Sequence, residues 1–315
     1  MAKSTAHPNI ALIKYWGKED PTLNLPASPS LSLTLSGLKT STSVRLDPKL
    51  KQDVFILNGK KIESPKISTF MNKVRELAEC QTFSVIETRN NFPTSAGHAS
   101  SASGFAALSV ACSQEYKLNL NHDQLSRLAR IGSGSATRSI DEGLVAWQCG
   151  TDKTSFGTSI VSSDQIPLVV LSFTNDKSPK KISSTKAMEI VKKTSPYYDS
   201  WIKRSTADFR DALELVKNSD WQNLLALGEA NSLGMHAATI AAKPSIIYFS
   251  PDSLKLMDQV RKIRAEKKLP IYFSLDAGPN VKVFTLKDKL AAVEKEFKDW
   301  DYTLSFPGEG AKLID

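Results

Sequence analysis

The chain is poor in the residues that build metal centres and disulfide frameworks. Its 315 residues include three cysteines and four histidines. Cys80, Cys112 and Cys149 lie far apart, and neither a CxxC pair nor an HExxH spacing occurs, which argues against a zinc ribbon, a redox motif and a disulfide scaffold. Cys112 lies in an apolar run and fits a small core residue. We therefore expect a reduced, cytoplasmic protein without a structural metal.

Long apolar runs and dense charged tracts are also missing. No stretch approaches the roughly 18 apolar residues of a membrane span, and the first residues lack the apolar segment of a signal peptide, so no membrane partner is expected. Lys and Arg total 41 against 33 Asp and Glu, a formal net charge of +8. This surplus leaves nucleic acid, an acidic membrane and a small polyanionic substrate open as partners. The basic residues occur as scattered pairs without interleaved aromatics, which disfavours nucleic acid.

Hydrophobic patterning indicates an α+β chain with a strand-rich first half and a more helical second half. The regular strand–helix alternation of a doubly wound sheet is absent. A polar segment precedes a new apolar run near 165–167, where we place a boundary between domains 1–165 and 166–315. The predicted strands cover 9–16, 30–35, 41–46, 54–57, 60–62, 84–88, 144–148, 168–173, 271–276, 281–285 and 301–305. The predicted helices cover 67–80, 104–116, 125–131, 183–191, 198–215, 221–238, 251–266 and 287–297.

Three local patterns make these expectations specific. Alternation of Ser or Thr with Leu over 30–35 predicts a half-buried strand, and 41–46 is expected to be its partner. The Asn58-Gly59 dipeptide between two short apolar runs predicts a hairpin. Ser253 or Asp252 is expected to cap the helix that begins near 251.

A run of small residues at 93–104 directly precedes a predicted helix. Small side chains allow the backbone to approach a ligand, and Gly97 can adopt a positive φ. The helix start offers unpaired N–H groups and the positive end of the dipole, which suit phosphate. The run lacks the GxxxxGK[ST] pattern of a P-loop, and a simple turn that caps a buried helix remains an alternative. The candidate nucleotide-loop residues are Ser95, Gly97, Ser100 and Ser101, and a serine hydroxyl such as that of Ser101 could hold Mg²⁺.

Four motifs in order give the chain a resemblance to a known family. The segment at 91–102, Asn-Phe-Pro-Thr-Ser-Ala-Gly-His-Ala-Ser-Ser-Ala, resembles the ATP-phosphate loop of the GHMP kinase superfamily. The segments at 7–18 (His-Pro-Asn-Ile-Ala-Leu-Ile-Lys-Tyr-Trp-Gly-Lys), 132–139 and 276–280 (Asp-Ala-Gly-Pro-Asn) resemble the diphosphomevalonate decarboxylases within it. The resemblance implies a β-rich N-terminal domain like domain 2 of ribosomal protein S5, a ferredoxin-like C-terminal α/β sandwich, and an active site in the cleft between them.

The resemblance also implies a reaction with ATP and Mg²⁺. A 3-hydroxy-3-methyl acid that carries a 5-diphosphate is phosphorylated at its tertiary hydroxyl, and phosphate and CO₂ then leave. Asp276 is expected to orient or deprotonate the hydroxyl, although an Asp that begins an ordinary turn fits the same residues. Lys18 is expected to neutralise charge beside Asp276. Arg138 is expected to hold the substrate carboxylate bidentately, with the flexible Gly-Ser run before it allowing close approach.

Further residues follow from the same resemblance. Lys14 is expected at the surface or behind the site, with diphosphate contact as an alternative. The candidate substrate contacts are Asn9, Tyr15, Lys18, Ser133, Ser135, Arg138 and Ser184, and Lys180 is a candidate for the ATP phosphates. A homodimer is the family expectation.

Two positions depart from the family pattern, and three other functions stay open. His98 replaces the usual Leu after the loop glycine, and Asp141-Glu142 replaces apolar and glycine residues. The two carboxylates could recognise a cation or face solvent. The alternatives are a decarboxylase of the monophosphate, a small-molecule kinase such as a mevalonate 3-kinase, and a non-catalytic RNA-binding protein. The joint presence of Asp276, Lys18 and Arg138 argues against a plain kinase.

Overall fold

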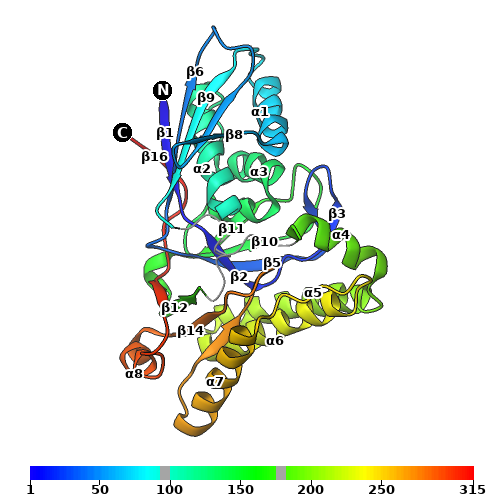
Figure 1. Cartoon of the computed structure of the whole chain (residues 1–315), viewed down its shortest axis with the longest axis vertical. Helices are drawn as coiled ribbons and strands as arrows, with labels where there is room; N and C mark the ends of the chain where they lie inside the picture. Colours follow the sequence, from blue (N-terminus) through cyan, green and yellow to red (C-terminus); the bar gives the residue numbers. More distant parts are fainter. Residues whose placement is uncertain (93–99, 175–181) are drawn as a thin grey trace.

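The computed structural model describes residues 1–92, 100–174 and 182–315. This part of the chain contains three large sheets, a two-stranded hairpin and eight α-helices (Figure 1). The first sheet contains six strands, and β7 is parallel to β9 whereas its other pairs are antiparallel. Its order is β16 (Lys312–Ile314), β1 (Ala2–Ala6), β6 (Thr40–Leu46), β9 (Ser84–Asn90), β7 (Val54–Leu57) and β8 (Lys60–Ile62).

The two other large sheets have four antiparallel strands each. The second has the order β11 (Gly157–Val161), β10 (Leu144–Trp147), β5 (Ser30–Thr34) and β2 (Asn9–Ile13). The third has the order β13 (Tyr272–Ser274), β14 (Lys282–Leu286), β12 (Leu168–Phe173) and β15 (Tyr302–Ser305). A small hairpin joins β3 (Lys18–Asp20) to β4 (Leu25–Pro26). The strands β2 and β13 therefore each lie at the edge of a sheet, and both matter for the site below.

The helices divide between the two halves of the chain. Those of the first half are α1 (Pro65–Leu77), α2 (Ser100–Glu115) and α3 (His122–Gly132), with the 3₁₀ turns η1 (Gly134–Ser139) and η2 (Ser163–Gln165). Those of the second half are α4 (Ser184–Thr194), α5 (Tyr198–Lys217), α6 (Trp221–Ile240), α7 (Pro251–Lys267) and α8 (Leu290–Glu294), with η3 (Lys287–Lys289). None of the described helices is long and apolar enough to cross a membrane.

Buried apolar side chains of the described residues form four clusters. Helices α1, α2 and α3 share one cluster with the first sheet around Phe70, Phe105 and Cys112, so the expected core position of this cysteine is confirmed. A central core contains Leu31 of the second sheet together with Val170 of the third. Helices α5 and α6 contribute side chains to the same core. The two halves are thus joined by a shared hydrophobic layer rather than by a linker.

Most predicted elements are present, and four details are wrong. The strand β5 pairs with β2 and β10, whereas 41–46 belongs to β6 in the first sheet. All five residues of β5 are buried rather than alternate ones, because its serines face a buried arginine while its leucines enter the core. Ser250, not Ser253 or Asp252, caps α7, and Ser253 completes its capping box. The helix expected at 287–297 is η3 followed by the short α8.

The first and last strands of the chain are paired with each other. The last strand, β16, pairs with β1, so both termini lie side by side at the edge of the first sheet (Figure 1). The sequence patterns gave no sign of either strand. The hairpin at 54–62 is confirmed, and Asn58 and Gly59 both adopt positive φ as its tight turn requires.

Candidate active site

A polar cleft collects side chains from β2, the β3–β4 hairpin, α2, η1, α4, α6 and the loop after β13. Nine residues expected in the site line it: Asn9, Tyr15, Lys18, Ser101, Ser133, Ser135, Arg138, Ser184 and Asp276. Ser95, Gly97, His98 and Lys180 lie outside the described residues. Ser100 is the first residue of α2, and its side chain is likewise not described. The cleft also contains Lys14, for which diphosphate contact was one of the expected alternatives, and Lys66, which sequence reasoning had not named.

An ion pair between Lys14 and Asp276 lies at the centre of the cleft. The Nζ atom of Lys14 is 2.7 Å from Oδ1 of Asp276. The Lys14 side chain is 2% exposed and that of Asp276 is 31% exposed, so the carboxylate is the partner that solvent or a ligand can reach. Of the places expected for Lys14, the surface is therefore excluded, and Lys14 directly contacts Asp276 inside the cleft. Burial lowers the pKa of Lys14, and Arg138 lowers it further, while Asp276 acts in the opposite direction.

Arg138 is held by the serine face of β5. Its Nε donates to Oγ of Ser32 at 2.9 Å and its Nη1 to Oγ of Ser30 at 2.6 Å. Its guanidinium carbon lies 5.5 Å from the centroid of the Trp147 ring. Burial lowers the pKa of Arg138 to about 10, so it stays cationic at neutral pH. The Gly-Ser run before it is the buried 3₁₀ turn η1 rather than a flexible loop, which fixes the arginine in place.

Lys18 faces the same cleft from the β3–β4 hairpin. Its Nζ donates to Oδ1 of Asn24 at 2.6 Å. The Asn24 amide in turn donates to the carbonyl oxygens of Arg130 and Ile131 at the end of α3. Gly17, at φ +127°, makes the turn into this hairpin, and any side chain there would collide with Tyr198. Burial lowers the pKa of Lys18.

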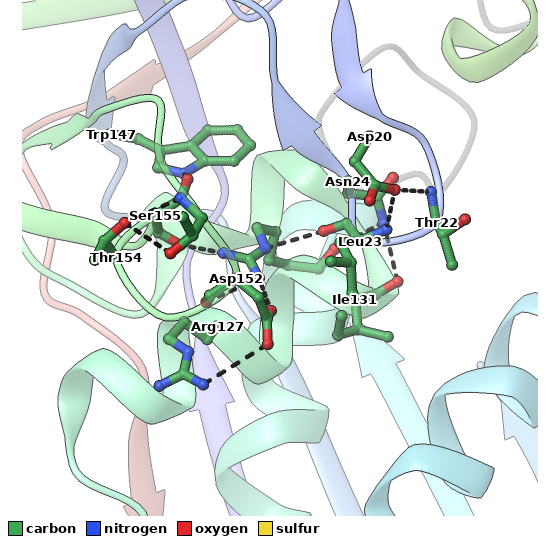
Figure 2. A network of polar contacts seen from close by, with 12 residues as sticks. Asp20, Thr22, Leu23, Asn24, Arg127, Ile131, Trp147, Asp152, Thr154 and Ser155 are labelled. Atoms are coloured by element: carbon green, nitrogen blue, oxygen red, sulfur yellow. Dashed lines mark hydrogen bonds and ion pairs between the residues drawn. The ribbon is translucent and has the colours of Figure 1, made fainter.

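The buried side chain of Arg130 joins two loops, one between β3 and β4 and one between β10 and β11. Figure 2 shows the labelled residues of this network, among them Leu23, Asp152 and Ser155. Arg130 donates to the carbonyl oxygens of Leu23 and Ser155 and to the carboxylate of Asp152. Ser155 also accepts a hydrogen bond from Nε1 of Trp147 at 2.9 Å. Through these contacts one guanidinium fixes both the hairpin that carries Lys18 and the aromatic wall beside Arg138.

Tyr15 completes that wall. Its ring centroid lies 4.8 Å from that of Trp147, and Gly134 leaves room for its hydroxyl, because a Cβ there would lie 2.5 Å from it. Within the described part of the chain the buried Tyr15 hydroxyl has no hydrogen-bond partner. A buried hydroxyl in that state is available to a ligand in the cleft.

Serine hydroxyls gather where α2 and α4 begin. Ser133 is 3.2 Å from Ser135 and 3.3 Å from Ser101, measured between Oγ atoms. Ser184 is the first residue of α4, behind the capping Ser183. Two helix starts that open on one cleft, each with serine hydroxyls, favour phosphate groups.

An apolar pocket adjoins the polar cleft, and Ser101 lines both. The hairpin β7–β8 contributes Phe55 and Ile62, and α2 contributes Phe105. Lys66 of α1 places its ammonium 5.2 Å from the centroid of the Phe105 ring, at the junction with the polar cleft. Desolvation of the Lys66 ammonium, followed by the charge of the neighbouring Lys18, lowers the pKa of Lys66 to about 8. Sequence reasoning named no residue for a nucleotide base, because these side chains look like ordinary core residues in the pattern.

The two unusual carboxylates point away from this chemistry. Asp141 accepts from the His122 ring at 3.1 Å, and Glu142 accepts from the hydroxyl of Ser163 at 2.8 Å. Neither residue lines the cleft. Cation recognition and solvent exposure were the two roles expected for these carboxylates. In the structure both carboxylates hydrogen-bond to neighbouring side chains. Burial raises the pKa of Asp141.

The fold and the cleft define an α+β protein of the GHMP kinase fold with a cationic cleft. Residues 6–158 match the family model described as the diphosphomevalonate decarboxylase-like N-terminal domain, and residues 169–303 match that of the mevalonate 5-diphosphate decarboxylase C-terminal domain. The chain therefore belongs to the diphosphomevalonate decarboxylase family.

Individual relatives agree with this assignment. The solved structure of the mevalonate diphosphate decarboxylase from Enterococcus faecalis is 41% identical, with a TM-score of 0.94 over 100% of this chain and 98% of that one. Another structure, also 41% identical with a TM-score of 0.95 and the same coverage, is a complex with MVAPP, AMPPCP and magnesium. The phosphomevalonate decarboxylase of Haloferax volcanii is 28% identical over 100% of this chain and 98% of its own length.

Proposed function

We propose that the chain catalyses the ATP-dependent decarboxylation of (R)-5-diphosphomevalonate to isopentenyl diphosphate, with release of ADP, phosphate and CO₂. The observation that carries the proposal is the Lys14–Asp276 pair in one cleft with Arg138 and Lys18. A reachable carboxylate beside buried cations provides both a base and sites for the anionic groups of the substrate.

The first step is phosphoryl transfer to the tertiary hydroxyl. Asp276 orients this hydroxyl and accepts its proton, and the oxygen attacks the γ-phosphorus of ATP as ADP leaves. Lys14 fixes the position of the Asp276 carboxylate through their 2.7 Å ion pair. Positioning and charge neutralisation supply most of the catalysis in such transfers.

The second step is elimination. The C3–O bond breaks and releases phosphate, the C1–C2 bond breaks and releases CO₂, and the electron pair of the latter forms the new double bond. Arg138 holds the C1 carboxylate until it leaves. Lys18, Tyr15, Ser133, Ser135 and Ser184 are proposed contacts for the rest of the substrate.

ATP enters as its magnesium complex, and its base is proposed to occupy the apolar pocket beside α2. That pocket meets the polar cleft at Ser101 and Lys66, so the phosphates would run from one to the other. Ser101 would hold Mg²⁺ through its hydroxyl, and Ser95, Gly97, Ser100 and Lys180 are proposed nucleotide contacts by resemblance. The described residues contain no cluster of three His, Cys, Asp or Glu side chains suited to a metal.

A cytoplasmic homodimer is proposed on family resemblance, and light scattering would test the oligomeric state.

A decarboxylase of the monophosphate is the second candidate, favoured by the full-length match to the Haloferax volcanii enzyme. One experiment separates the candidates. The protein is incubated with ATP, Mg²⁺ and mevalonate, its 5-phosphate or its 5-diphosphate, and ADP and CO₂ are followed together. Both products from the diphosphate are expected. CO₂ from the monophosphate alone would favour the second candidate, and ADP without CO₂ would indicate a kinase. If no substrate yields ADP or CO₂, the proposed enzymatic activity is refuted.

A further inference from the structure

Helix α6 lies between the edges of two sheets, and polar side chains on it bind the backbone of both. On one side, Oδ1 of Asn231 accepts the backbone N–H of Lys14, which directly follows β2, at 2.8 Å. On the other side, Oγ of Ser232 accepts the N–H of Leu275 at 3.0 Å and donates to its carbonyl oxygen at 3.1 Å. Leu275 directly precedes Asp276. Two consecutive residues of one helix therefore hold the two halves of the central ion pair.

Both side chains are buried, and a neighbouring residue orients the amide of Asn231. Asn231 is 1% exposed and Ser232 is fully buried. The amide nitrogen of Asn231 donates to Oδ2 of Asp208 on α5 at 2.9 Å. Because a carboxylate can only accept here, this contact sets the amide so that its oxygen faces the Lys14 N–H. One turn earlier, Glu229 accepts the N–H of Phe273 at 3.0 Å and thereby holds β13 in the same register.

The edge positions of β2 and β13 explain why side chains are needed. An edge strand leaves backbone N–H and C=O groups without partners from its own sheet, and buried groups of this kind must find hydrogen bonds elsewhere. Any polar neighbour could supply these hydrogen bonds. Asn231 and Ser232, however, are adjacent on one helix and bind the backbone at Lys14 and at Leu275, so together they also fix the distance between the two sheets beside the Lys14–Asp276 pair.

We propose that Asn231 and Ser232 are positioning residues that set the Lys14–Asp276 geometry for phosphoryl transfer. The proposal rests on the proposed function, because it is read through turnover. A displacement of a reacting group by about 1 Å can cost on the order of 100-fold in rate. Neither residue lines the cleft, so the loss should fall on kcat, with the KM values for ATP and for the second substrate nearly unchanged.

The test uses Ser232→Ala, Ser232→Cys and Asn231→Ala in the full chain, with Thr239→Val as the matched control. Thr239 is a buried residue of α6 whose hydroxyl bonds only within the helix, to the carbonyl of His236. We expect kcat to fall about 10- to 100-fold in Ser232→Ala and Asn231→Ala. A smaller fall is expected in Ser232→Cys, because a thiol is a weak donor and acceptor. Both KM values should stay within about threefold, and Thr239→Val should match the wild type.

Two outcomes would overturn the proposal: kcat within twofold of the control in the folded variants, or KM values that rise in step with the fall in kcat. If circular dichroism shows Ser232→Ala or Asn231→Ala to be unfolded, Ser232→Cys, which nearly preserves side-chain volume, decides alone against the control. A wild-type protein that yields neither ADP nor CO₂ would instead refute the proposed function, so the two failures are distinguishable.

Discussion

Replacement of Asp276 by Asn separates the charge of this side chain from its shape. The amide is nearly isosteric with the carboxylate and can still accept from Lys14, but it cannot take a proton from a hydroxyl. Lys14 would be left 2% exposed, with Arg138 as its cationic neighbour and no anion in contact. Activity and stability should therefore both change, for different reasons.

The magnitudes follow from the geometry. Loss of a general base costs about 10²- to 10⁴-fold in kcat. Removal of one partner from a fully buried ion pair costs about 3–5 kcal/mol of unfolding free energy. Asp276 is 31% exposed and the amide keeps a hydrogen bond, so we expect about 1–3 kcal/mol at pH 7. Nucleotide affinity should remain, since the apolar pocket and Lys66 are unchanged.

The pH dependence has a definite sign. Burial already lowers the pKa of Lys14 below its unfolded value of 10.5, so between the two values the unfolded chain binds more protons and stability rises with pH. In Asp276→Asn the carboxylate no longer opposes this shift, and the folded pKa falls further. The stability gap between variant and wild type should thus be widest at pH values below both folded pKa values of Lys14. It should narrow as pH rises through those two values toward 10.5, because Lys14 then loses its charge in both proteins.

Urea unfolding at several pH values, ATP titration calorimetry and single-turnover ADP release measure these effects. Asp258→Asn is the matched control, because its carboxylate pairs with Lys262 at 2.8 Å on an exposed helix face and should cost less than about 0.5 kcal/mol. The double variant Lys14→Met with Asp276→Asn should recover most of the lost stability but no turnover. More than a tenth of wild-type kcat in Asp276→Asn, or an unchanged stability at pH 7, would refute the reasoning.

Two further substitutions test the supports of the cleft. Arg130→Lys cannot reproduce the fork to Leu23, Asp152 and Ser155, so unfolding free energy should fall by about 2–4 kcal/mol. The KM of the phosphorylated acid should also rise as Lys18 loses its support, and unchanged values of both would exclude the network from this role. Lys66→Met should raise the KM for ATP about fivefold, a change of about 1 kcal/mol, with kcat unchanged. An unaltered KM in steady-state assays would remove Lys66 from the nucleotide site.

The sequence could identify most elements because their signals are local. The Asn58-Gly59 hairpin, the helix at 198–215 and the apolar run at 168–173 each depend on neighbouring residues. Strand partners depend on the whole chain, and the alternating pattern at 30–35 therefore led to the wrong partner. The same pattern predicted a solvent-facing serine side, whereas Ser30 and Ser32 bind Arg138. A buried arginine makes a polar strand face compatible with the interior.

The choice between Lys14 and Lys18 shows where residue spacing stops being informative. A regular strand from 9 to 16 would allow side-chain direction to be read from parity. The pairing of β2 with β5 is irregular between Ala11 and Ile13, and the strand ends at Ile13, so parity is lost just before Lys14. Gly17 then reverses the chain with a positive φ and carries Lys18 into the hairpin. Both lysines reach the cleft by different routes, and only the structure distinguishes the one that contacts Asp276.

The cleft contains more positive than negative side chains, and this excess contributes to the lowered pKa values of its lysines. Among its described lining residues, the charged side chains are Lys14, Lys18, Lys66, Arg138 and Asp276, four cations against one carboxylate. Desolvation is the main cause of the lowered pKa of both Lys14 and Lys66. Repulsion adds to it, because Arg138 lowers the pKa of Lys14 further and Lys18 lowers that of Lys66 further. A ligand that brings a carboxylate and several phosphates would reverse both effects by supplying the missing anions. The local surplus of three positive charges therefore accounts for part of the net +8, and the cationic cleft favours polyanionic substrates over neutral ones.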